Sequence, residues 1–243
     1  MKPILFNTEM VRAILDDRKS VTRRVVKPGH LRVLDSQYHK EHPEVPDKTL
    51  LEKLCLPPYQ PGDTLWVRET WCKAHGHYLY RAFPGIGMEP ERQDAAMREM
   101  GLKWRPSIHM PREAARLFLR VTGVRVERLQ ESFFDQGDAP IKALQNEGID
   151  IGDQCRQCIE NYGNPCCNDL DPELEPDENG EDKNGGSECG MLDEVRSDFA
   201  KLWDNTVKPE DRATYGWAAN PWVFVIEFER ISKDEALGGG GDG

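Results

Sequence analysis

Apolar and polar residues alternate along the chain in patterns that predict both helices and strands. One apolar stripe contains Val11, Ile14 and Leu15, and it follows Asn7, a favourable N-cap residue. This pattern predicts a short helix that ends near Arg18. Runs rich in Val, Leu, Phe and Trp predict strands at residues 20–26, 64–71, 115–128 and 222–230. Helices and a sheet are therefore expected in the same fold.

Further helices are expected around these strands. Pro90 and Gly101 bracket one, and residues 138–148 predict another with Gly148 at its C-terminal cap. Gly123 interrupts the third strand, as a bulge or bend in a curved sheet would. We therefore expect an α+β fold, a β-barrel with peripheral helices. Helical spacing also predicts a late amphipathic helix with an apolar stripe of Met191, Val195, Phe199, Leu202 and Trp203.

An acidic segment interrupts this pattern. Residues 168–190 contain few apolar side chains and many Pro, Gly and Glu, so burial cannot offset the entropy cost of ordering them. We expect one domain over residues 1–232, which contains a Cys-rich, acidic and partly disordered insertion at residues 151–190. Residues 233–243 have the composition of a flexible, Gly-rich tail.

The net charge of −11 is unevenly distributed. Residues 151–194 hold 13 Asp and Glu against two basic residues, so the remainder of the chain sums to zero. Residues 1–34 hold eight Lys and Arg against three acidic residues, which leaves a basic face for nucleic acid. No apolar run reaches the roughly 18 residues of a transmembrane helix, and the start does not resemble a signal peptide. We therefore expect a cytoplasmic protein without a membrane partner.

The most informative group of polar residues follows the first predicted helix. Lys19, Thr22 and Arg24 have the spacing Lys-x-x-Thr-x-Arg. Alternation along a strand puts Thr22 and Arg24 on one face, about 7 Å apart and within reach of Lys19 in the turn. A hydroxyl, an ammonium group and a guanidinium on one surface suit a phosphate or a polarised carbonyl. A solvated basic turn after a surface helix is the alternative interpretation.

This spacing resembles the signature of ASCH domains, small β-barrels related to the PUA RNA-binding fold. Their pattern is Gly-x-Lys-x-x-(Glu or Thr)-x-Arg, and Asp17 stands here where the glycine is expected. Three further segments resemble the longer ASCH proteins of phages and prophages: residues 61–71, 104–116 and 215–228. The resemblance implies a PUA-like β-barrel with RNA or a modified nucleoside bound in its cleft.

The resemblance also implies an activity. Small bacterial ASCH enzymes that deacetylate N-acetylcytidine use a threonine, a lysine and a glutamate, and Thr22, Lys19 and Glu147 are the corresponding positions here. Thr22 would attack the acetyl carbonyl with Lys19 as base, and Glu147 would shuttle the proton. Arg24 would hold a phosphate or stabilise the oxyanion. The alternatives to this amidohydrolase are a non-catalytic RNA-binding regulatory module and a ribonuclease.

Tryptophans interleaved with arginines form a second group of candidates, because aromatic rings stack on bases while arginines pair with phosphates. Trp66, Trp203 and Trp222 are expected in the core, and the other three tryptophans fit either role. Besides Arg24, the substrate-binding candidates are Arg68, Glu69, Trp71, Trp104, His109, Arg112, Trp217 and Asn220.

Five of the seven cysteines lie within 35 residues of one another. Cys155-x-x-Cys158, followed by Cys166, Cys167 and Cys189, matches the ligand set of a structural zinc site, with one of the adjacent pair to spare. Free thiols in a mobile insertion are the alternative. The acidic residues around them either form a solvated spacer or recruit a basic partner.

If Cys155, Cys158, Cys189 and either Cys166 or Cys167 bind zinc, the purified protein will contain about one equivalent of zinc per chain by elemental analysis. Chelation will loosen residues 151–190 without melting the rest of the fold. Metal-free protein in which all these thiols react with a thiol reagent would contradict the prediction.

Overall fold

The computed structural model describes residues 1–82, 90–133, 139–149 and 190–238. They form helices and β-strands, which confirms the expected α+β class. The chain divides into two compact units: unit 1 comprises residues 1–126 and 224–243, and unit 2 comprises residues 127–223. The predicted arrangement of one domain, an insertion and a tail stays a prediction. No described helix is long and apolar enough to cross a membrane.

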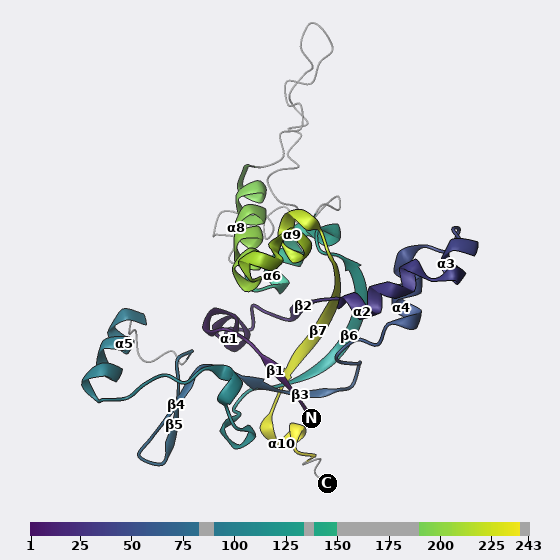
Figure 1. Ribbon diagram of the computed structural model, residues 1–243. Helices are drawn as coiled ribbons and strands as arrows, with labels where there is room; N and C mark the ends of the chain where they lie inside the picture. The colour runs from purple at the N-terminus through teal and green to yellow at the C-terminus, as the bar shows by residue number, and fades with distance from the viewer. Residues whose placement is uncertain (83–89, 134–138, 150–189, 239–243) are drawn as a thin grey trace, which may run out of the picture. The chain divides into compact units, whose positions relative to one another are not determined.

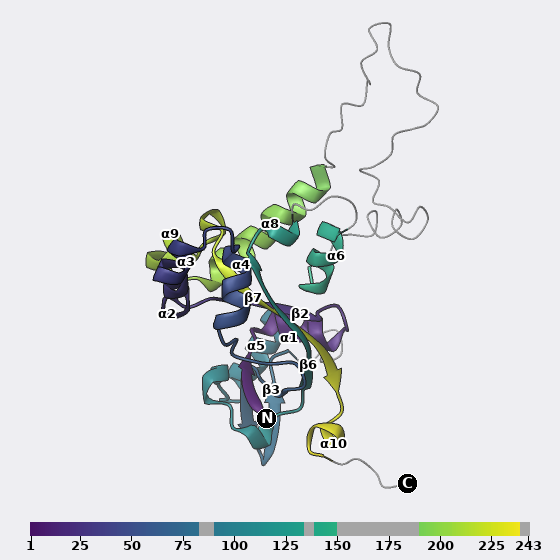
Figure 2. The same cartoon turned by 90° about the vertical axis from the view of Figure 1, so that its right-hand side faces the viewer.

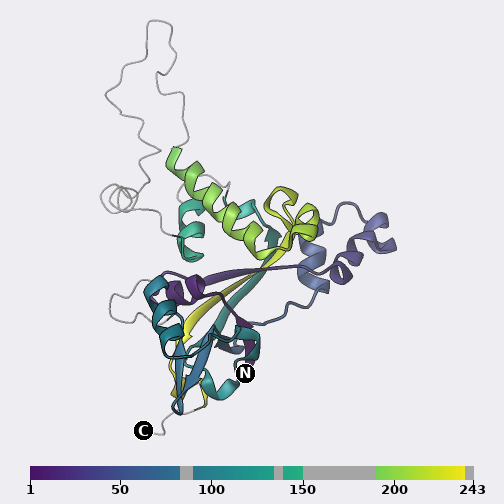
Figure 3. The ribbon, with the colours of Figure 1, turned by 60° about the vertical axis from the view of Figure 1, so that its left-hand side comes forward.

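Unit 1 is built on a five-stranded sheet (Figure 1). From edge to edge its strands are β1 (Lys2–Leu5), β3 (Thr64–Arg68), β6 (Phe118–Arg128), β7 (Trp222–Ile231) and β2 (Val21–Val25). β1 runs parallel to β3, with Ile4 opposite Val67, and β3 runs antiparallel to β6. The inner strands β6 and β7 are long and lie next to each other (Figures 2 and 3). The part of β6 after Val126 and the part of β7 before Phe224 belong to unit 2. The predicted strands at 20–26, 115–128 and 222–230 are confirmed.

Side chains connect the two edges of this sheet. Arg24 Nη2 on β2 donates a hydrogen bond to the carbonyl of Leu5 at the end of β1 (2.9 Å). Its guanidinium lies 5.6 Å from the ring centroid of Phe6, which packs against Phe228 of β7 at 6.0 Å. No backbone pairing of β1 with β2 is found among the described strands. The predicted barrel is therefore an open sheet that curves far enough for its edges to meet through side chains.

Gly123 lies where β6 approaches β7 closely. A Cβ atom at this position would lie 2.7 Å from Glu227 Oε2. The predicted interruption of the strand at Gly123 does not end it, because β6 runs through this position to Arg128. The missing side chain leaves room for the carboxylate of Glu227, which pairs with Arg125 of the same strand as the glycine.

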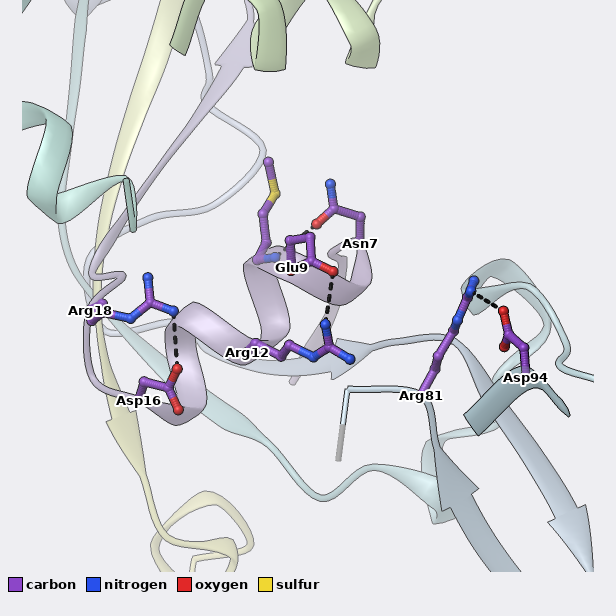
Figure 4. Close-up of polar contacts among 8 residues, drawn as sticks. Asn7, Glu9, Arg12, Asp16, Arg18, Arg81 and Asp94 are labelled. Atoms are coloured by element: carbon purple, nitrogen blue, oxygen red, sulfur yellow. Dashed lines mark hydrogen bonds and ion pairs between the residues drawn. The ribbon is translucent and has the colours of Figure 1, made fainter. Parts of the chain in front are cut away.

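The first helix, α1 (Thr8–Leu15), begins as predicted. The side chain of Asn7 accepts a hydrogen bond from the N–H of Met10 at 2.8 Å, and Figure 4 shows this cap. The helix buries Val11 and Ile14 against unit 1 and ends at Leu15, three residues before the predicted end. Exposed ion pairs on its polar side join Arg12 to Glu9 and Arg18 to Asp16 (Figure 4).

Three short helices follow β2 that the sequence pattern did not predict. They are α2 (Pro28–Leu31), α3 (Gln37–Glu41) and α4 (Asp47–Leu54). None reaches three turns, so an apolar period cannot repeat often enough to be recognised. Only α4 buries apolar side chains, Leu50 and Leu51.

The predicted strand at 64–71 is wrong at its end, because it divides into two elements. β3 stops at Arg68, and Trp71 begins a hairpin of β4 (Trp71–Ala74) and β5 (His77–Tyr80). His75 and Gly76 have φ values of 50° and 84°, as a two-residue hairpin turn requires. The hairpin is a separate two-stranded sheet (Figure 1), followed by the predicted helix α5 (Pro90–Glu99).

Unit 2 contains the other predicted helices. α6 (Ala139–Asn146) is followed by Gly148 with φ of 83°, and α8 (Gly190–Thr206) is the predicted amphipathic helix, the long green helix of Figure 3. Phe133, Phe199 and Trp217 pack with ring centroids 4.6 to 5.7 Å apart. The short helix α9 (Arg212–Tyr215) precedes Trp217. In unit 1, α10 (Lys233–Ala236) follows β7 with Ser232 and Glu235 as a capping box.

Gly216→Ala will lower the free energy of unfolding of unit 2 by about 1–3 kcal/mol, the usual cost of overpacking. A Cβ at Gly216 would lie 2.6 Å from the backbone oxygen of Arg212 and 3.1 Å from Asp204 Oδ1. Gly29→Ala is the control, since nothing lies within 4 Å of its Cβ position. It will leave stability unchanged or raise it by roughly 0.5–1 kcal/mol in denaturant titrations. Equal effects of the two substitutions would contradict the prediction.

Candidate functional site

The turn between α1 and β2 contains a residue in the left-handed conformation. Asp17 has φ of 55°, the left-handed conformation for which a glycine would be favoured. The N–H groups of Arg18 and Lys19 both donate to the carbonyl of Ala13, at 2.8 and 3.0 Å, and so reverse the chain after the helix. Asp17 Oδ2 accepts from Arg230 Nη2 of β7 at 3.2 Å. The side chain of Asp17 therefore adds a contact to the sheet.

The motif residues that follow this turn are buried. Lys19 is 4% exposed, Thr22 2% and Arg23 5%. Lys and Arg are almost never buried to this extent unless they are paired, and both of these side chains have interaction partners. The alternative interpretation, a solvated basic turn, is therefore wrong at Lys19. Three buried polar residues within five positions make the segment from Lys19 to Arg23 the strongest candidate for a functional element in unit 1.

Arg24 is half-buried and faces β1. Its Nη2 donates to Leu5 and its guanidinium covers Phe6, as described for the sheet. Part of its hydrogen-bonding capacity therefore serves to join the sheet edges. Its predicted role toward a phosphate or an oxyanion stays a prediction.

Glu147 directly follows α6 and is 7% exposed, so it is not a surface glutamate. Its N–H donates to Leu144 at 3.1 Å, and Gly148 caps the helix in the left-handed conformation as predicted. Glu147 belongs to unit 2, whereas Lys19 and Thr22 belong to unit 1. Their predicted convergence on one cavity stays a prediction.

Glu69 is 1% exposed and lies between β3 and β4. Arg116 donates to it through Nε and Nη2, both at 2.8 Å, in a bidentate ion pair. The Arg116 guanidinium also lies 4.2 Å from the ring centroid of Tyr80. Burial raises the pKa of Tyr80, whose hydroxyl donates to the carbonyl of Ala114. Glu69 therefore holds the hairpin to the start of β6, a structural role that accounts for its burial.

Trp71 and Trp104 anchor the segment that precedes β6. Trp71 is 4% exposed and exchanges two backbone hydrogen bonds with Arg105, at 2.7 and 3.2 Å. Trp104 is half-buried and donates from Nε1 to Asp94 Oδ1 at 2.9 Å. The other oxygen of Asp94 pairs with Arg81, and Figure 4 shows this contact. Both tryptophans therefore make structural contacts, and only Trp104 keeps a partly accessible ring.

The remaining candidates of unit 1 lie at its surface. Arg68 donates to the carbonyl of Ile108 and stacks over Trp66, 5.4 Å from the ring centroid. His109 and Arg112 are exposed, and Arg112 lies 3.6 Å from the sulfur of Met1. Their side chains are accessible to a ligand in solution.

The candidates of unit 2 support its local structure. Trp217 belongs to the aromatic cluster with Phe133 and Phe199. Asn220 has φ of 45°, and its Oδ1 accepts from the N–H of Gln130 at 2.9 Å. These contacts fix the chain before β7 and account for both residues without a ligand.

The predicted zinc ligands Cys155, Cys158, Cys166 and Cys189 lie outside the described residues. Within the described part of the chain, no group of three or more His, Cys, Asp or Glu could hold a metal ion. Cys55 and Cys72 are buried free thiols.

Sequence reasoning missed Arg116 and Arg230. Arg116 and Arg230 pair with Glu69 and Asp17, which lie 47 and 213 residues away in the chain. No local pattern reports such pairs.

No family model matches the chain, and searches of curated proteins and of solved structures found no match. The resemblance to ASCH domains therefore depends on the motif and the three quoted segments alone.

Asp17→Gly will be more stable than Asp17→Ala by about 1 kcal/mol, because only glycine adopts positive φ without steric cost. Both variants lose the exposed contact with Arg230, so their difference isolates the backbone term. Asp16 is the matched control: it also forms an exposed ion pair, but its φ is −85°. There Asp16→Ala will be at least as stable as Asp16→Gly. Equal stability of the two Asp17 variants in denaturant titrations would show that the turn does not adopt this conformation.

Proposed function

We propose that this chain is an ASCH-family protein with a PUA-like fold, and that unit 1 binds RNA or a modified nucleoside at the turn between α1 and β2. The observation that supports this most strongly is the motif itself. Asp17 takes the conformation of the motif glycine, and Lys19 and Thr22 are buried directly after it. A buried lysine beside a buried hydroxyl is costly to maintain and is typical of functional sites.

The curvature of the sheet supports the PUA-like fold. A PUA-like protein has a small barrel, and here a five-stranded sheet brings its two edges together through Arg24, Leu5 and Phe6. The helix between β1 and β2 carries the motif at its C-terminal end, as the resemblance to ASCH domains expects.

The distribution of charge supports a nucleic-acid ligand for unit 1. Unit 1 contains 24 Lys and Arg against 20 Asp and Glu, whereas unit 2 contains eight against 23. The negative charge of the whole chain therefore does not apply to the unit that carries the motif. A net positive unit attracts the phosphates of RNA.

Thr22 favours a second, more specific function, amide hydrolysis of acylated cytidine. The Thr22 hydroxyl would attack the acetyl carbon while Lys19 takes its proton, and the cytosine amine would leave with a proton. Water would then release acetate from the threonine ester. This role requires Lys19 to be able to lose its proton at neutral pH, and loss of hydration on burial acts in that direction.

The wild-type protein will release acetate from N-acetylcytidine, and Thr22→Ala will abolish the release. Lys19→Ala will reduce it by roughly 10²–10⁴-fold, the usual contribution of a general base. Thr22→Ser will keep part of the activity because the hydroxyl remains. Thr122→Ala, at an exposed threonine of β6, is the control and will keep full activity.

Two outcomes would change the proposal. If wild-type protein binds the nucleoside or RNA but releases no acetate, the hydrolase function is wrong and the binding function stands. If Thr22→Ala and Lys19→Ala change neither binding nor release, the turn is not the site.

A further inference from the structure

The β4–β5 hairpin places aromatic and basic side chains on one face. Trp71 is opposite Tyr80 and Lys73 is opposite Tyr78 in the antiparallel register. Cross-strand partners point to the same side of a sheet, as do residues two apart in one strand. All four side chains therefore share one face. Arg105 joins them, because its backbone pairs with that of Trp71 on the other side of β4.

Two neighbouring rings on this face have a cation at each end. Lys73 Nζ lies 5.1 Å from the ring centroid of Tyr78, the rings of Tyr78 and Trp71 are 5.7 Å apart, and the Arg105 guanidinium lies 5.2 Å from the Trp71 ring. Lys73 and Arg105 are exposed, while Trp71 is buried beneath them. We call Lys73, Tyr78, Trp71 and Arg105 the cation–aromatic row. Its accessible groups are an ammonium at one end and a guanidinium at the other.

The backbone beneath Arg105 is firmly held. Two backbone hydrogen bonds join Arg105 to Trp71, and the neighbouring Trp104 donates a side-chain hydrogen bond to Asp94. Met110 is buried in the cluster that contains Trp71. The guanidinium therefore lies with one side toward the Trp71 ring while its residue is exposed to solvent. Because one side of this planar cation already lies against a ring, a second flat group can stack on its other side with little further loss of side-chain conformational entropy.

The surroundings of the row are strongly basic. Residues 71–82 and 103–116 contain six Lys and Arg and only one acidic residue, Glu113. Arg81 and Arg116 pair with Asp94 and Glu69. The other four basic residues, Lys73, Lys103, Arg105 and Arg112, are exposed. Glu113 accepts a hydrogen bond from the Tyr78 hydroxyl and raises the pKa of that tyrosine.

We propose that the cation–aromatic row binds single-stranded RNA, with a base stacked on the Arg105 guanidinium and backbone phosphates beside Lys73 and Lys103. Single strands expose base faces that stack on arginine planes, and their phosphates require exposed cations. A duplex hides the base faces and would leave the stacking position unused. This surface goes beyond the motif site of the proposed function, on which it depends only for RNA as the class of ligand.

A fluorescently labelled single-stranded RNA of mixed sequence is the probe, titrated with the full chain at moderate salt. Arg105→Ala will weaken binding about tenfold, the typical effect of removing one stacking contact. Arg105→Lys keeps the charge but not the planar group, and will recover only part of the loss. Arg32→Ala, at an exposed arginine outside this face, removes the same charge and will change the affinity by less than about twofold.

Three results would contradict the proposed binding surface. The wild type does not bind the strand, Arg105→Ala and Arg32→Ala lower the affinity equally, or Arg105→Lys restores the full wild-type affinity. Failure here is separable from failure of the proposed function. If the protein binds or deacetylates the free nucleoside but does not bind the strand, only the proposal for the cation–aromatic row is wrong. If strand binding depends on Arg105 but the nucleoside does not bind, only the proposal for the motif site is wrong. Because Arg105 is exposed, the melting temperatures of Arg105→Ala and Arg105→Lys will match that of the wild type.

Discussion

The contact of Arg24 with the opposite edge of the sheet is the constraint on which unit 1 depends. A five-stranded sheet with free edges exposes unpaired backbone groups at β1 and β2. The guanidinium of Arg24 satisfies the carbonyl of Leu5 and covers the ring of Phe6, so one side chain serves both edges. Next to this edge, Lys19 before β2 and Thr22 and Arg23 on β2 are buried.

Burial changes the chemistry of the motif residues. An ammonium group in water is fully solvated and remains protonated at neutral pH, whereas a buried one loses hydration and must be compensated by partners. Lys19 and Arg23 are both buried, and neither residue is without an interaction partner. A fold that only needed stability would place apolar residues at these positions, because replacing buried charges by well-packed apolar groups is often neutral or stabilising. The presence of Lys19 before β2 and of Arg23 on β2 therefore favours a role in binding or catalysis.

Local signals were sufficient for the elements that carry their own pattern. The Asn7 cap, the long strands β6 and β7, α8 and the left-handed Gly148 were all predictable from neighbouring residues. β1 was missed because only Ile4 of its four residues is buried, and its pairing with β3 is made some 60 residues away. The division of the strand at Glu69 was missed for the same reason, since the buried carboxylate depends on Arg116, 47 residues later. Motif spacing identified Lys19 and Thr22, but their burial follows from contacts that no short segment contains.

The same physical distinction separates the two groups of polar residues in unit 1. Lys19, Thr22 and Arg23 are buried, so they can act only on a ligand that enters the protein or displaces their present partners. At the hairpin Trp71 is buried and Tyr78 is half-buried, whereas Lys73 and Arg105 are exposed and can act on a ligand that stays at the surface. A modified base attached to a strand presents both kinds of group, a flat polar base and an extended charged backbone. The two proposals assign one of these environments of unit 1 to each part of such a ligand, while the excess negative charge is confined to unit 2.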